Sequence, residues 1–191
     1  MKPMYALACT MLLLFGACSD APETSGSNPS AEMDTEPSPG IDADLASVQA
    51  YELTMEGIDK YYEAMKNVRI AMNELSPEER EQLEMELNAE ESNSLEDMAA
   101  SIDRNTLYRE ALDDAGLSEE EFAILTMSIL QSGMAAAIVD MQPNANPDSL
   151  IREMHANPKN VAFMRENRDA LDAKQQAMEA ELEALGISDE E

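Results

Sequence analysis

Apolar residues recur at three- and four-residue steps along most of the chain from Asp42 onward, which is the spacing of amphipathic helices. The first such run predicts a helix over 45–73. Ser76 is followed by proline and, three residues on, by Glu79, the combination of a capping box. It predicts the start of a second helix that runs to about Glu90 with a thin apolar face and an acidic surface.

Two shorter helices follow in the same pattern. Ser94 has the residue type of an N-cap, and a second short helix is expected over 106–114. Gly116 is placed to end it in the left-handed conformation. Ser118 with Glu121 repeats the capping box, so another helix is expected to start there. These signals predict an all-α fold.

The stretch from Phe122 to Val139 carries no charged residue. A helix that is apolar all round belongs at the centre of a bundle, although its length also reaches the lower limit for a membrane span. We therefore predict an irregular bundle of about five to six helices around a central apolar helix over about 119–140. Residues on one face of this helix are expected to form a core or an apolar pocket: Met127, Leu130, Met134, Ile138 and Met141.

The C-terminal part predicts one short and one long helix. Pro147 opens the short helix, and Asn157 followed by Pro158 starts the long one, which Gly186 ends. The long helix carries a heptad-like apolar seam that is expected to pack along the bundle or, alternatively, to bind a partner: Met164, Leu171, Met178 and Leu185.

Composition supports helices and excludes some partners. Aromatic residues make up 4% of the 191 residues, there is no Trp, and Met is abundant, so an aliphatic helical core is expected. Against 12 Lys and Arg stand 40 Asp and Glu, which gives a net charge of −28. Binding to nucleic acid requires clustered positive charge, so no nucleic-acid partner is expected, and attachment to anionic lipid by charge is disfavoured too.

The N-terminus predicts export and lipidation. Lys2 is followed by an apolar run from Met4 to Phe15, as in a signal peptide. The sequence Phe15-Gly16-Ala17-Cys18 resembles the lipobox of bacterial lipoproteins, with Phe15 in place of the usual Leu. The resemblance implies cleavage before Cys18 and a lipid on Cys18 that tethers the chain to a membrane. Ser19 after the cysteine implies sorting to the outer membrane, with the protein facing the periplasm.

The chain is thus expected to have three parts. Residues 1–17 form the signal peptide, and 18–41 form a lipidated cysteine with a disordered acidic tether rich in Pro and Ser. Residues 42–191 form the acidic helical domain. Residues 107–136, with Asn160-Val161-Ala162-Phe163 and Asn167, resemble small secreted helical bacterial proteins, which implies an all-helical fold and export and brings no catalytic residues.

Candidate catalytic and metal-binding residues are few. His155 is the only histidine and lies at a helix junction, where a capping or surface role is expected. No Cys or His spacing suggests zinc, and Asp42 with Asp44 lacks the later ligands of a calcium loop. The methionines form no dense tract for copper(I). No catalytic residue, metal or cofactor is therefore predicted.

Three functions stay open at this point. The first is a non-catalytic, membrane-anchored interaction or adapter module that binds an envelope protein. The second is a periplasmic carrier of an apolar ligand, held in a flexible pocket rich in Met and Ala. The third is an enzyme, which would need perturbed acidic groups in a cleft around His155.

Overall fold

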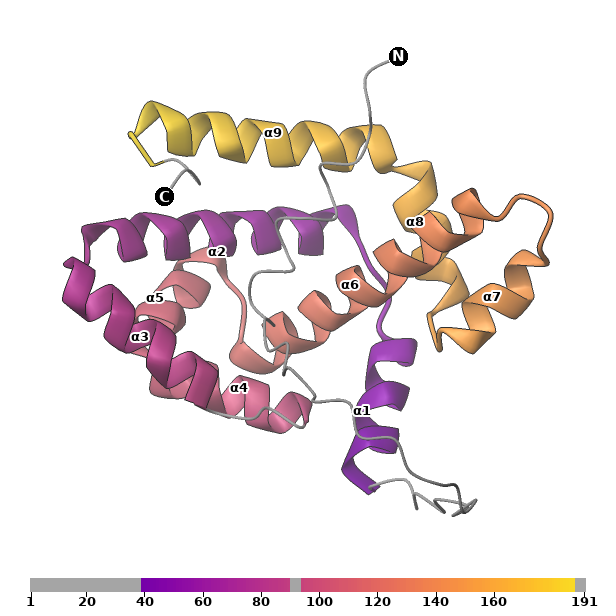
Figure 1. Ribbon diagram of the computed structural model, residues 1–191, viewed down its shortest axis with the longest axis horizontal. Coiled ribbons are helices and arrows are strands. Elements are labelled where there is room, and N and C mark those ends of the chain that lie inside the picture. Colours follow the sequence, from indigo (N-terminus) through magenta and orange to yellow (C-terminus); the bar gives the residue numbers. More distant parts are fainter. Residues whose placement is uncertain (1–38, 90–93, 188–191) are drawn as a thin grey trace, which may run out of the picture. The chain divides into compact units, whose positions relative to one another are not determined.

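Nine α-helices and no strand make up the residues that the computed structural model describes, 39–89 and 94–187 (Figure 1). The predicted all-α fold is confirmed, but the helices are more numerous than the about five or six expected. Cys18, the predicted signal peptide over 1–17 and the predicted tether up to residue 38 lie outside the described residues. The described helices belong to one unit, Pro37–Glu191.

The first helix begins ahead of the domain boundary expected at residue 42. In chain order the helices are α1 (Pro39–Ala50), α2 (Met55–Glu74), α3 (Pro77–Ala89), α4 (Leu95–Arg104), α5 (Thr106–Ala115), α6 (Glu119–Met141), α7 (Pro147–Glu153), α8 (Pro158–Glu166) and α9 (Arg168–Ala184). The central position predicted for the apolar helix is confirmed, because α6 contacts α1, α2, α4, α5, α7 and α8.

The predicted capping residues start their helices as expected. Ser76 and Glu79 form a complete capping box, in which the Ser76 N–H donates to the Glu79 carboxylate at 2.8 Å and the Glu79 N–H donates to the Ser76 hydroxyl at 3.3 Å. Ser94 and Ser118 cap α4 and α6 in the same way, each accepting from a backbone N–H three residues on. Each cap satisfies an N–H group that lacks a partner inside its helix.

The helix predicted over 45–73 is wrong in one respect, because the chain breaks it into α1 and α2. Residues 51–54 between them belong to no helix. Thr54 has φ −131° and ψ 156° and accepts a hydrogen bond from Gly57 N–H, so it acts as the N-cap of α2. A non-helical segment inside a bundle leaves backbone groups without helical partners, and these must be satisfied from elsewhere.

Two asparagines at the start of α8 supply those partners. The Asn160 side chain accepts from Leu53 N–H at 2.9 Å and donates to the Tyr51 carbonyl at 2.9 Å. The Asn157 amide donates to the carbonyls of Tyr51 at 3.0 Å and Gln49 at 2.8 Å. We call Asn157 and Asn160 the asparagine clasp. It joins residues more than a hundred positions apart and takes the place of the helical hydrogen bonds that the break removes.

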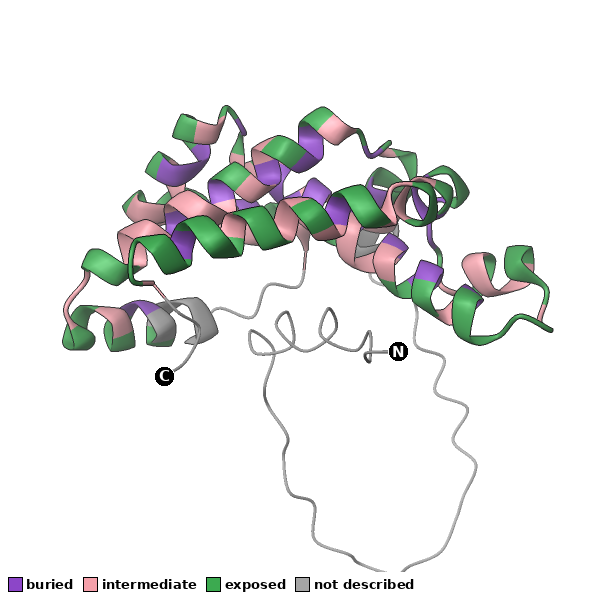
Figure 2. Cartoon of the chain, turned by 90° about the horizontal axis from the view of Figure 1, so that it is seen from above, coloured by how far each residue is buried: buried purple, intermediate pink, exposed green. Residues whose placement is uncertain are grey.

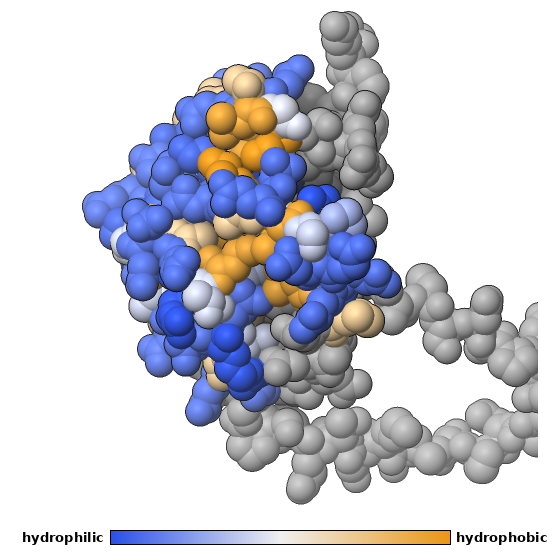
Figure 3. Space-filling view, turned by 90° about the vertical axis from the view of Figure 1, so that its left-hand side faces the viewer, coloured by the Kyte–Doolittle hydropathy of each residue, from blue (hydrophilic) through white to orange (hydrophobic). Residues whose placement is uncertain are grey.

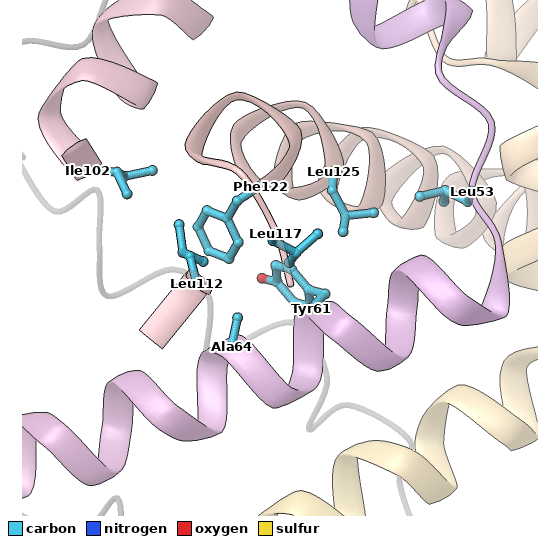
Figure 4. Packing of buried hydrophobic residues seen from close by; sticks show 8 residues of the cluster. All are labelled: Leu53, Tyr61, Ala64, Ile102, Leu112, Leu117, Phe122 and Leu125. Carbon is cyan, nitrogen blue, oxygen red and sulfur yellow. The ribbon is translucent and has the colours of Figure 1, made fainter. Parts of the chain in front are cut away.

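The main core lies where α2, α4, α5 and α6 meet (Figure 4). Tyr61 of α2 stacks on Phe122 of α6 with ring centroids 5.6 Å apart. Burial raises the pKa of Tyr61 to about 12. The eight buried members of this cluster are Leu53, Tyr61, Ala64, Ile102, Leu112, Leu117, Phe122 and Leu125. Leu117 and Phe122 share the cluster, as expected of a hydrophobic staple at the start of α6.

The long C-terminal helix predicted from Pro158 is divided at Asn167 into α8 and α9. The Asn167 side chain donates to the Phe163 carbonyl at 2.9 Å, and this local bond satisfies the end of α8. α9 then packs against α2. Seen from above, α9 is largely exposed (Figure 2), and its buried residues are Leu171 and Leu182.

α2 and α9 run parallel to one another. Lys66 of α2 pairs with Glu181 of α9 at 3.1 Å, and Lys174 of α9 pairs with Asp59 of α2. Both pairs join residues 115 positions apart. A residue further along α2 therefore pairs with one equally further along α9, which requires the two helices to point in the same direction. Short loops favour antiparallel neighbours, so this pairing reflects the long path through α3 to α8 that separates the two helices.

Three helices end in a residue with left-handed backbone. At Gly116 and Gly186 φ is +69° and +78°, which glycine adopts without cost. The third position is His155 at φ 55°, the only non-glycine residue with positive φ in the described part of the chain. Its N–H donates to the Arg152 carbonyl, and the next N–H, of Ala156, donates to Ile151. This is a Schellman motif, so His155 has a capping role, as expected.

Replacing His155 by glycine is expected to stabilise the protein by about 1 kcal/mol, since glycine removes the steric cost of the left-handed conformation. The Gln49 side chain bonds to the backbone carbonyl of residue 155, so this contact is kept. Urea unfolding of both proteins measures the difference. The reverse change at a matched site, Gly186→Ala, is expected to destabilise by a similar amount, because no atom lies near the added methyl group and only backbone strain counts. A destabilised His155→Gly protein would contradict the assignment.

Candidate interaction surface

The interior side of α6 is made mainly of small residues. Ser128, Ser132 and Ala135 are buried, and Ala136 and Val161 join Ala135 in a second core cluster at the junction with α7 and α8. Small side chains allow the α8 backbone to come close to α6. At Gly133, a methyl group would lie 3.6 Å from the Met164 side chain of α8. At this junction the helix therefore turns small residues inward, whereas Phe122 and Leu125 nearer its start fill the main core.

The opposite side of α6 is an exposed apolar stripe. Met127 is 38% exposed, Met134 51% and Met141 69%. Leu130 and Ile138 are half-buried between them. We call these five residues the methionine face. The prediction that they form a core is wrong for the three methionines: the sequence spacing places all five on one side of the helix, but that side faces outward.

The length of this face is set by the helix. From Met127 to Met141 it spans about 21 Å at 1.5 Å per residue. Gln131 lies in line with it, half-buried and uncharged. By length and composition, α6 is the one helix in the described residues that could cross a membrane. Within its apolar stretch, 44% is buried inside the protein. Between Met127 and Val139, α6 thus presents an exposed strip without any charged side chain.

The C-terminal seam is mostly used inside the protein. Leu171 is buried, Met164 packs against both core clusters, and Met178 is half-buried. Only Leu185, at the end of α9, is largely open, at 60% exposed. The seam thus packs along the bundle, as its first interpretation predicted, and the alternative of a continuous partner surface is wrong. Figure 3 shows small apolar patches among hydrophilic residues on the end of the unit that it views.

Most of the cations in the described residues already pair with carboxylates. Arg165 and Arg168, for example, both pair with the Asp140 carboxylate, Arg165 at 3.1 Å. These arginines lower the pKa of the Asp140 carboxyl group. The cationic side chains in recorded ion pairs are Lys60, Lys66, Arg109, Lys159, Arg165, Arg168 and Lys174. Because the chain carries −28, the field around the helices stays strongly negative.

The first turn of α6 adds three carboxylates to one end of the methionine face. Glu119, Glu120 and Glu121 follow the Ser118 cap directly. Glu120 is exposed and lies seven positions before Met127, so both residues are on the same side of the helix. At the other end, Asp140 is neutralised by its arginines. The face therefore has one negative end and one end close to neutral.

Two hollows open on the described surface. One of about 400 Å³ is lined by charged residues around the Asp140 pair, including Arg165 and Arg168. The other, of about 480 Å³, lies beside His155 and is lined by side chains such as Asp148 and Arg152. Neither has the apolar lining that the ligand-carrier alternative needs. In the described part of the chain, no three His, Cys, Asp or Glu side chains are grouped to hold a metal ion.

Sequence reasoning missed two features of this region. The asparagine clasp was not predicted, although Asn157 and Asn160 stand three positions apart at a helix start. The in-line positions of Glu120 and Gln131 were missed too, and the available signal was their spacing from Met134, fourteen residues for Glu120 and three for Gln131. Comparisons with family models, with curated proteins and with solved structures give no match, so function rests on the residues described above.

Proposed function

We propose that this chain is a lipid-anchored, non-catalytic interaction module of the bacterial cell envelope, and that the methionine face of α6 is its binding surface. One observation carries the proposal: Met127, Met134 and Met141 are exposed in a row on an otherwise acidic helical unit. Fully burying a methionine side chain stabilises by about 1.5–3 kcal/mol, so covering these half-exposed side chains would contribute about 1 kcal/mol each.

The chemistry of the surface suits binding better than catalysis. Methionine side chains are flexible and polarizable, and they adapt to partners of different shape. The resemblance of residues 15–18 to a lipobox supports an anchor at Cys18, and the acidic tether that follows would hold the helices off the lipid. Location at the periplasmic side of the outer membrane is part of this proposal. The carrier alternative is less favoured, because both hollows are lined largely by polar side chains.

In-cell photo-cross-linking tests the proposal. A photoreactive amino acid replaces Met134 in one full-length protein and Met85 in a matched control, since Met85 is 60% exposed on α3. We expect position 134 to give a defined cross-linked envelope protein in cells, identified by mass spectrometry, and position 85 to give none. A Cys18→Ala version of the Met134 protein should lose the product if the anchor brings the partners together. The absence of any protein product at position 134 would refute the proposal.

A further inference from the structure

The spacing of the methionine face is that of a helix–helix seam. Its residues Met127, Leu130, Met134, Ile138 and Met141 follow one another at steps of three or four, and with Gln131 in place of Leu130 the steps alternate between four and three. Such a 4–3 repeat keeps an apolar stripe in contact with a second helix lying alongside it. An extended peptide has a period of two and would not follow the stripe. The geometry of the face therefore favours a helical occupant over an extended one.

The charge of the unit selects among helical occupants. The chain carries −28, and most of its described lysines and arginines are engaged in ion pairs. A second copy of the chain brings the same negative charge, so long-range repulsion opposes self-association. An anionic lipid surface is opposed for the same reason. A cationic helix, in contrast, is attracted by this field.

From these two observations we infer that the methionine face binds a cationic amphipathic helix, with an apolar stripe against the face and Lys or Arg along its flanks. The inference rests on the proposed function, since it names the partner class for the same surface. The two ends of the face also set an orientation. The carboxylates of Glu119, Glu120 and Glu121 lie at one end, and Asp140 with Arg165 and Arg168 at the other. The most basic end of the partner therefore lies beside Glu120.

Binding of synthetic helices tests the inference. The probes are an amphipathic Leu/Lys peptide of about 18 residues, long enough for the face, and the same peptide with Glu for Lys. The protein is the full-length chain produced in a bacterial host and held in phosphatidylcholine nanodiscs, with empty discs as the blank. Fluorescence anisotropy is expected to show binding of the Lys peptide at least about tenfold tighter than that of the Glu peptide. Raising the salt from about 50 to 500 mM should weaken it about tenfold.

Matched variants separate the face from general attraction to an acidic surface. The double change Met127→Gln and Met134→Gln is expected to lower affinity for the Lys peptide about tenfold, since it removes two apolar contacts of roughly 0.7 kcal/mol each. Met85→Gln, at a methionine on α3 that is 60% exposed, should change it less than about twofold. Glu120→Gln should weaken binding about threefold at low salt and reduce the salt dependence.

The outcomes that overturn the inference differ from those that overturn the proposed function. Equal binding of the Lys and Glu peptides, or binding unchanged in the Met127 and Met134 variant, refutes the cationic helix. The cationic helix is also refuted if sedimentation shows that the chain alone forms a dimer, that added salt stabilises this dimer, and that the Met127 and Met134 variant does not form it. A cellular cross-link from position 134 to a segment without basic residues would refute the inference and leave the interaction module standing. The absence of any cross-link from position 134 would refute both the inference and the proposed function.

Discussion

Replacing Asn160 by alanine is expected to lower the free energy of unfolding by about 2–4 kcal/mol. The Asn160 side chain is 1% exposed, and it pairs with both Leu53 N–H and the Tyr51 carbonyl. Alanine leaves the Leu53 N–H buried without a partner and the Tyr51 carbonyl with only its bond from Asn157, because residues 51–54 belong to no helix. Urea unfolding of the full-length chain, followed by helical circular dichroism, measures the loss.

The matched control is Asn144→Ala, in the exposed loop between α6 and α7. It is expected to change the free energy of unfolding by less than about 0.5 kcal/mol. An Asn160→Ala protein within about 1 kcal/mol of the parent would show that water or a shift of the chain replaces the side-chain amide, and that the clasp does not hold α1 and α2 to α8.

The local parts of the fold could be predicted from the sequence. Ser76 with Glu79 forms the expected capping box, and Gly116 ends α5 with the expected left-handed backbone. These features involve residues within four or five positions of one another, so the sequence around each contains all the partners. The helix starts and the all-α class follow from such local signals.

The break between α1 and α2 could not be predicted in this way. The apolar pattern of 45–73 continues through Tyr51 and Met55 without interruption. What favours the break over a continuous helix is the set of hydrogen bonds from Asn157 and Asn160, which lie more than a hundred residues away. Periodicity reports which residues can share a face, but it contains no information on backbone partners from a distant helix.

The orientation of α6 illustrates the same limit at the candidate site. Because the helix lacks charge from Phe122 to Val139, no polar side marks the face that meets water. Hydropathy favours burial of Met127, Met134 and Met141, whereas close packing with α8 requires small residues at the contact. Ser128, Ser132 and Ala135 are buried and the three methionines are exposed, so the packing of α6 decides its orientation. The sequence placed the five residues on one face, but it predicted burial for three methionines that are exposed.

Replacing Phe122 by alanine is expected to destabilise the protein by about 3–5 kcal/mol. Phe122 is buried at the first turns of α6, stacks on Tyr61 and shares a cluster with Leu117. Alanine leaves a cavity between α2 and α6 and removes the staple that follows the Ser118 cap. Thermal and urea unfolding measure the effect. Phe122→Leu keeps most of the volume and is expected to cost less than about 1.5 kcal/mol.

This variant also separates the stability of α6 from binding at its far side. Phe122 belongs to the buried side of the helix, and Met134 to the exposed side. Where the protein is still folded, the affinity of the Phe122→Leu protein for the Lys peptide should match that of the parent within about twofold, since none of the exposed contacts has changed. A large loss of affinity with the fold intact would mean that the two sides of α6 are coupled. The methionine face would then depend on the core packing beneath it, and binding would be expected to raise the stability of the whole helical unit.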